Sequence, residues 1–174
     1  MVSILRLLLI GSLLLFIQVG AGRLLDISGV RPDLLLVFIL SITFKRGRYF
    51  GLAAGFLFGV AQDLFTIGFL GVNALSKSTV AFWFGTWLAH RESAPRALNW
   101  LVLFTLCTFI QEVITGFFFL LGTDRNFGNY LVGTILPTAV YTGLLGFLWV
   151  LIPFKSVKGG KTLPRSKWKS TRDI

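Results

Sequence analysis

Three ionisable residues lie inside apolar stretches of this 174-residue chain: Asp63, Lys77 and Glu112. A charged side chain in lipid is costly, so it usually faces a charged partner or a polar cavity. A lysine at the same depth as two carboxylates lowers the cost of burying all three groups. We therefore predict an intramembrane polar cluster of these three residues, with Gln18 and Asn73 beside them.

Two interpretations of this cluster remain open. It is either a charge network that fixes how the helices pack, or a polar cavity for an ion, a small ligand or a partner helix. No catalytic residue is predicted, because Cys107 has no histidine near it in the sequence and looks like a small core residue. Asp26 and Asp33 are expected to cap helices and solubilise loops. The single His90 cannot by itself build a metal site, and no cofactor is predicted.

The elements that must position these residues are apolar helices. Hydrophobic residues make up 55% of the chain and charged residues 14%, with a mean hydropathy of +0.79. A soluble domain carries about 25% charged residues, so the composition predicts an all-α polytopic membrane bundle over residues 1–153. A basic tail over residues 154–174 is expected to be disordered. Six transmembrane helices are predicted, at residues 4–21, 29–44, 49–64, 72–89, 98–121 and 129–152.

The second predicted span is unusually short. Its uninterrupted apolar stretch, residues 34–44, is only 11 residues long, whereas a spanning helix needs roughly 17–25. Pro32 suits a first helical turn, and Asp33 suits the positive end of the helix dipole, so these two residues are expected to start the span. The apolar turn at residues 66–71 is a candidate re-entrant segment.

The distribution of Lys and Arg predicts the orientation. With six spans, thirteen of the 17 basic residues fall on the side of both termini and three on the other side. Basic loops favour the cytoplasm, so both termini are expected there. The net charge of +10 is concentrated in the tail and in short loops, which favours contact with anionic lipid over nucleic acid.

Small residues form a stripe on the third predicted span. Gly51, Gly55 and Gly59 recur every four residues, a pattern that lets two helices approach closely. The pattern leaves open whether the facing helix belongs to this chain, to a second copy in a homo-oligomer, or to a partner protein.

Several short motifs resemble those of one known family. They are Arg31-Pro32-Asp33-Leu34-Leu35-Leu36, then Gln62-Asp63-Leu64, then the run from Gly68 to Lys77. Their order and spacing resemble the bacterial rod shape-determining MreD family, and the resemblance covers nearly the whole chain.

The resemblance implies a non-enzymatic scaffold of the elongasome in the bacterial inner membrane, which helps direct side-wall peptidoglycan synthesis. The implied partner is MreC, a bitopic protein, within a complex that includes MreB, RodZ, RodA and its penicillin-binding protein. The family fold is similar to the substrate-binding subunits of energy-coupling-factor transporters. The alternative function is therefore a small-molecule-binding subunit of a transporter.

One hypothesis joins the residues to this resemblance. The short second span, the glycine stripe and the apolar turn would shape a groove for the single helix of an MreC-like partner. The cluster of Asp63, Lys77 and Glu112 would then hold this groove open.

Overall fold

The regular elements that the structure describes are all helices, as predicted. The computed structural model describes residues 4–20, 26, 30–66, 69–90, 97–121 and 126–151. The predicted basic tail and part of the turn at residues 66–71 lie outside these ranges. In chain order the helices are α1 (Ile4–Gly20), α2 (Leu34–Arg46), α3 (Arg48–Phe65), α4 (Val72–Ala89), α5 (Ala97–Leu120), α6 (Phe127–Tyr130), the π-helical turn η1 (Leu131–Ile135) and α7 (Leu136–Leu151).

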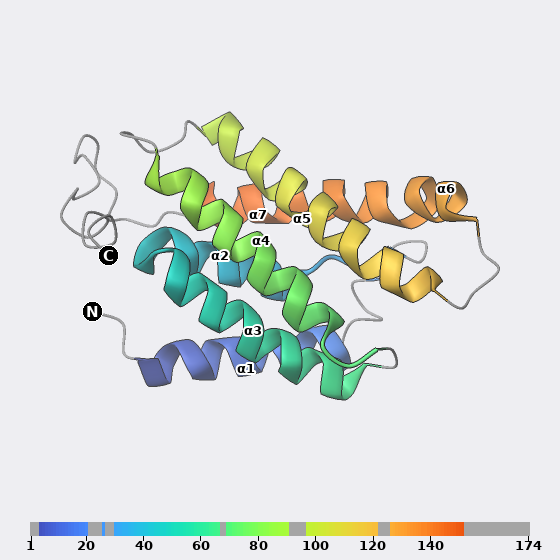
Figure 1. Ribbon diagram of the computed structural model, residues 1–174. Helices are drawn as coiled ribbons and strands as arrows, with labels where there is room; N and C mark the ends of the chain where they lie inside the picture. Colours follow the sequence, from blue (N-terminus) through green and yellow to red (C-terminus); the bar gives the residue numbers. More distant parts are fainter. Residues whose placement is uncertain are drawn as a thin grey trace.

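Successive helices alternate in direction (Figure 1). Helices α1, α3 and α5 run toward one end of the molecule, and α2, α4 and the continuous segment α6–η1–α7 run back. Two helical segments, Leu98–Leu120 and Phe127–Leu151, are long and apolar enough to cross a bilayer, and α1 is apolar but shorter. Only 28% and 33% of the most apolar window in these two segments is buried, whereas the core helix of a soluble protein is mostly buried. The number of six crossings stays a prediction.

Helix α2 is the central helix of the bundle. Residues 35–40, 42 and 43 are all buried, and α2 packs against α1, α3, α4 and α7. A helix enclosed by its neighbours can be short, since protein rather than lipid surrounds it. The helix begins at Leu34, so Asp33 is its N-cap residue and Pro32 precedes the cap rather than lying in the first turn.

The glycine stripe of α3 packs against two other helices of the same chain, α4 and α2. A Cβ at Gly55 would lie 2.8 Å from the Ser78 Cα on α4, and one at Gly59 would lie 2.4 Å from the Ala74 Cα. At Gly51 a Cβ would lie 2.1 Å from the Thr43 Oγ1 on α2. Because α4 and α2 fill this face, the glycine stripe does not line a groove for a partner helix, and a partner surface elsewhere on the bundle stays a prediction.

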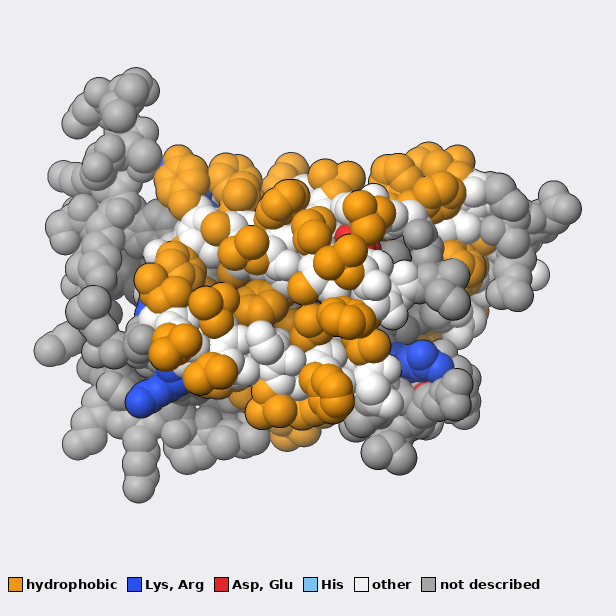
Figure 2. All heavy atoms as spheres, turned by 90° about the horizontal axis from the view of Figure 1, so that it is seen from below, with side chains coloured by type: hydrophobic (Ala, Val, Ile, Leu, Met, Phe, Trp, Pro, Cys, Tyr) orange, Lys and Arg blue, Asp and Glu red, His pale blue; other side chains and the backbone are white. Residues whose placement is uncertain are grey.

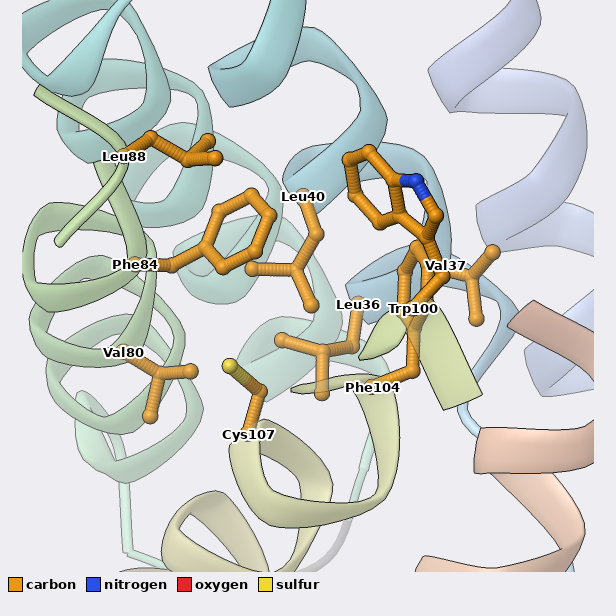
Figure 3. Packing of buried hydrophobic residues seen from close by; sticks show 9 residues of the cluster. All are labelled: Leu36, Val37, Leu40, Val80, Phe84, Leu88, Trp100, Phe104 and Cys107. Atoms are coloured by element: carbon orange, nitrogen blue, oxygen red, sulfur yellow. The ribbon is translucent and has the colours of Figure 1, made fainter. Parts of the chain in front are cut away.

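The largest apolar cluster joins α2, α4 and α5. Its side chains converge in Figure 3, where Leu36 and Leu40 from α2 lie in the middle and Val37 from the same helix lies to one side. Around them lie Val80, Phe84 and Leu88 from α4, and Trp100, Phe104 and Cys107 from α5. A second apolar cluster joins α1, α2, α3 and α4 through residues such as Leu15, Leu35 and Phe58.

Outside the core, the molecule presents apolar side chains to its surroundings. On the face shown in Figure 2, hydrophobic side chains spread across the middle, and Lys and Arg side chains lie toward the two ends. Large residues such as Leu5 and Phe16 of α1 are 65% and 77% exposed. This distribution matches lipid around the middle of the bundle and water or head groups at its ends.

The last helical segment adjusts its backbone ahead of Pro137. A proline inside a helix cannot donate its backbone hydrogen bond and crowds the preceding turn. The segment forms the π-helical turn η1 just before it, where the Leu136 backbone N–H donates to the Leu131 carbonyl. Ahead of Pro137 the helix therefore widens locally.

Candidate functional site

The polar site is built around Asp33, at the N-terminus of α2. Its Oδ1 accepts a hydrogen bond from the Leu36 backbone N–H at 2.9 Å, which satisfies one of the free donors at the start of the helix. Its own backbone N–H donates to the Thr142 Oγ1 on α7 at 3.0 Å. Asp33 is only 5% exposed, so its carboxylate needs a buried partner.

That partner is Lys77 of α4, which is fully buried. The Lys77 Nζ donates to the Asp33 Oδ2 at 2.5 Å and to the Gln111 Oε1 at 3.3 Å. A buried ammonium group is tolerated only when an opposite charge and further hydrogen bonds replace its water. Asp33 and Gln111 supply these contacts to Lys77.

Two glutamines complete the arrangement. The Gln111 Nε2 on α5 donates to the Asp33 Oδ2 at 2.8 Å, and the Gln18 Nε2 on α1 donates to the Asp33 Oδ1 at 3.1 Å. The Gln18 Oε1 accepts from the Leu35 backbone N–H at 3.0 Å. We call Gln18, Asp33, Lys77 and Gln111 the Asp33 network. It links α1, α2, α4 and α5 at one point.

Asp63 has a different role from the one expected. It sits near the end of α3, and its carboxylate accepts from the backbone N–H groups of Gly71, Asn73 and Ala74 at 3.0 to 3.2 Å. The Asn73 Nδ2 donates to it at 2.8 Å. Asp63 therefore holds the N-terminus of α4, where the helix dipole favours a negative charge. The expected pairing of Lys77 with Asp63 is replaced by the pairing with Asp33.

Beside the Asp33 network lies a polar cavity of about 460 Å³. The exposed ion pair between the Arg31 Nε and the Asp26 Oδ2, at 2.9 Å, lines its outer part. Among the predicted cluster residues, Gln18, Asn73 and Glu112 line the cavity, together with Asp33. Amides and hydroxyls from α3, α5, η1 and α7 complete the lining, namely Gln62, Thr66, Gln111, Thr115, Thr134 and Thr138.

Sequence reasoning missed Asp33 as the partner of Lys77. A spanning helix of full length would begin at the outer boundary of the membrane, and the sequence predicts Asp33 only as the cap of such a helix. The signal was the shortness of the second apolar stretch: a central helix of 13 residues is about 20 Å long, which is shorter than the roughly 30 Å hydrocarbon core of a bilayer. Its N-terminus therefore lies inside the bundle, level with Lys77.

The contacts of this site hold helices together through buried hydrogen bonds and one ion pair. Within the described residues no three His, Cys, Asp or Glu side chains gather to hold a metal ion. Cys107 is 7% exposed and belongs to the apolar cluster, as expected for a core residue.

Comparison with known proteins identifies the family. The family model of the rod shape-determining protein MreD matches residues 1–156. No curated protein and no solved structure gives a match, so the similarity to energy-coupling-factor subunits stays a prediction. The match covers most of the 174 residues, including every helix of the bundle and the whole polar site. The chain belongs to the MreD family of rod shape-determining membrane proteins.

Proposed function

We propose that this protein is a non-enzymatic scaffold subunit of the elongasome that binds an MreC-like bitopic partner. In this role it helps direct side-wall peptidoglycan synthesis, alongside MreB, RodZ, RodA and its penicillin-binding protein. The observation that carries the proposal is the family match over residues 1–156.

The geometry supports a scaffold because the bundle is held in one arrangement. The Asp33 network links four helices by hydrogen bonds in the buried interior. Satisfied polar networks of this kind specify one packing over its alternatives. Since the glycine stripe is occupied by α4 and α2, a partner helix would lie against the lipid-facing surface of the bundle.

The proposed topology is six crossings of the bacterial inner membrane, with both termini in the cytoplasm. The alternating directions of the helices support it (Figure 1), as does the excess of Lys and Arg on the terminal side. In this topology the polar cavity lies at the periplasmic end, and the basic tail rests on anionic lipid of the cytoplasmic leaflet.

Native mass spectrometry of the tagged full chain, extracted mildly from its own membranes, tests the scaffold role. A bitopic protein that co-purifies at fixed stoichiometry is the expected result, and depletion of the chain should round the cells. The Gly55→Leu variant is the matched control, because its side chain cannot fit against α4 and the complex should be lost. A bound small molecule without any protein partner would contradict the proposal.

One observation favours the second candidate, a small-molecule-binding subunit of a transporter. The cavity is polar, outward in the proposed topology, and has the volume of a small-ligand site. This function predicts uptake of a solute that stops when the chain is deleted while cell shape is kept. The scaffold function predicts that deletion of the chain changes cell shape and leaves solute uptake intact.

A further inference from the structure

Three amide groups that line the cavity already donate hydrogen bonds inside the protein. The Gln111 Nε2 donates to Asp33 and to Glu112. The Gln18 Nε2 also donates to Asp33, and the Asn73 Nδ2 donates to Asp63. A ligand that needs donors from the wall of this cavity would find the main amide groups occupied.

The acceptors of the cavity are less well satisfied. Gln62 is only 9% exposed, and its Oε1 is buried without a hydrogen-bond partner among the described residues. Glu112, which also lines the cavity, receives one long hydrogen bond of 3.3 Å from the Gln111 Nε2. A buried acceptor without a donor is unfavourable, so Gln62 favours a ligand that brings N–H groups, and Glu112 has room to accept further hydrogen bonds from the same ligand.

The charges of the cavity point to the same kind of ligand. Asp33 is paired with Lys77, and Asp26 is paired with Arg31. Glu112 forms no salt bridge with a described residue, which leaves the lining with one unpaired carboxylate. A positive charge placed in the cavity would offset it.

We infer that the cavity beside the Asp33 network binds a protonated primary amine, whose N–H groups donate to Glu112 and Gln62. The volume of about 460 Å³ suits a small organic amine or a lipid head group. Two sources next to a membrane carry this group, a soluble amine and phosphatidylethanolamine. The inference goes beyond the scaffold role, since it concerns the purified chain without a partner.

The first experiment measures binding of simple amines to the purified full chain in detergent. Ethanolamine should raise the thermal unfolding temperature in a saturable manner. Choline carries the same charge without N–H donors and should have little effect, and acetate should have none. Equal effects of ethanolamine and acetate would overturn the inference. It would also be overturned if no amine had an effect and the chain retained no phosphatidylethanolamine in the lipid experiment described next.

A lipid arm separates the two sources. The chain is reconstituted in bilayers that contain phosphatidylethanolamine or phosphatidylglycerol, and is then released for native mass spectrometry. Retention of phosphatidylethanolamine, displaced by excess ethanolamine, assigns the site to the head group. Ethanolamine binding without retained phosphatidylethanolamine assigns it to a soluble amine.

Two variants test the residues. Glu112→Gln keeps the shape of the side chain and removes its charge, so amine binding should weaken by about tenfold or more, which corresponds to about 1.4 kcal/mol. Gln62→Met removes the unpartnered oxygen, so the empty protein should unfold at a higher temperature while amine binding weakens. A merely structural Gln62 would change stability and leave binding intact.

Thr86→Val is the matched control for Gln62→Met. The Thr86 Oγ1 is also buried without a partner among the described residues, and it lies near the opposite end of α4, close to His90. The variant should raise stability and leave amine binding unchanged. Unchanged binding in both Glu112→Gln and Gln62→Met would overturn the inference, whatever the result of the partner experiment.

Discussion

At the scale of single residues, the interior of this protein depends on one buried ion pair. Lys77 is fully buried, and its ammonium group contacts Asp33 and Gln111. Removing one partner of a buried pair leaves the other charge without compensation, which costs more than the pair itself contributes.

Lys77→Met should therefore lower the free energy of unfolding by about 3–5 kcal/mol. Adding Asp33→Asn should recover part of this loss, because asparagine can still cap α2 and no longer carries a charge. Denaturant unfolding in detergent measures both variants. Lys45→Met, the same change at an exposed position, is the control. If Lys77→Met matches this control, the ion pair does not stabilise the fold.

Asp63 gives a second prediction at this scale. Because it accepts from three backbone N–H groups at the start of α4, Asp63→Ala should destabilise the protein by about 0.5–2 kcal/mol. Asp63→Asn should cost less. The measurement is thermal unfolding in parallel with recovery of the partner. A loss of partner recovery at unchanged stability would instead place Asp63 in a binding surface.

At the scale of elements, the main feature is the close packing of the α3 and α4 backbones. Helices with small residues at their contact bring their backbones together, and in lipid this packing is a main source of association. Gly55 and Gly59 face backbone atoms of α4 rather than flexible side-chain ends, so α4 cannot yield without moving as a whole.

Gly55→Ala and Gly59→Ala should each destabilise the bundle by about 1–3 kcal/mol, as overpacking does. Gly133→Ala is the matched control, because nothing lies within 4 Å of the added Cβ. The folded fraction recovered from membranes and the unfolding temperature give the comparison. Equal behaviour of all three variants would mean that α3 and α4 are not in close contact.

At the scale of the whole molecule, the helices place the polar cavity at one end and a basic rim at the other. Arg31 lines the outer part of the cavity, whereas Lys45 and Arg46 lie in the last turn of α2. This asymmetry follows from the alternating helix directions in Figure 1.

A labelling experiment tests the orientation. The chain has one cysteine, the buried Cys107, so the parent protein should not react with a membrane-impermeant maleimide. Arg31→Cys, at a side chain that is 60% exposed, should react in cells with a permeabilised outer membrane. Tyr49→Cys, at the opposite end, should react only after the inner membrane is opened. The opposite pattern would reverse the proposed topology.

The sequence alone predicted the family and the all-helical fold, and it marked Gln18, Asn73, Lys77 and Glu112 as intramembrane polar residues, because each leaves a local signal. Apolar runs mark helices, an ionisable residue within such a run marks a buried polar group, and the motifs around Asp33, Asp63 and Lys77 mark the family. Which of these polar side chains contact each other leaves no such local signal in the sequence. Equal depth along the helices predicted Asp63 beside Lys77, but Asp63 accepts from the backbone at the start of α4 and the burial of α2 brings Asp33 to Lys77. Only the tertiary structure could assign Asp33 to Lys77, Asp63 to the start of α4, and the glycine stripe to the interior, since these contacts depend on which helix faces are turned toward each other.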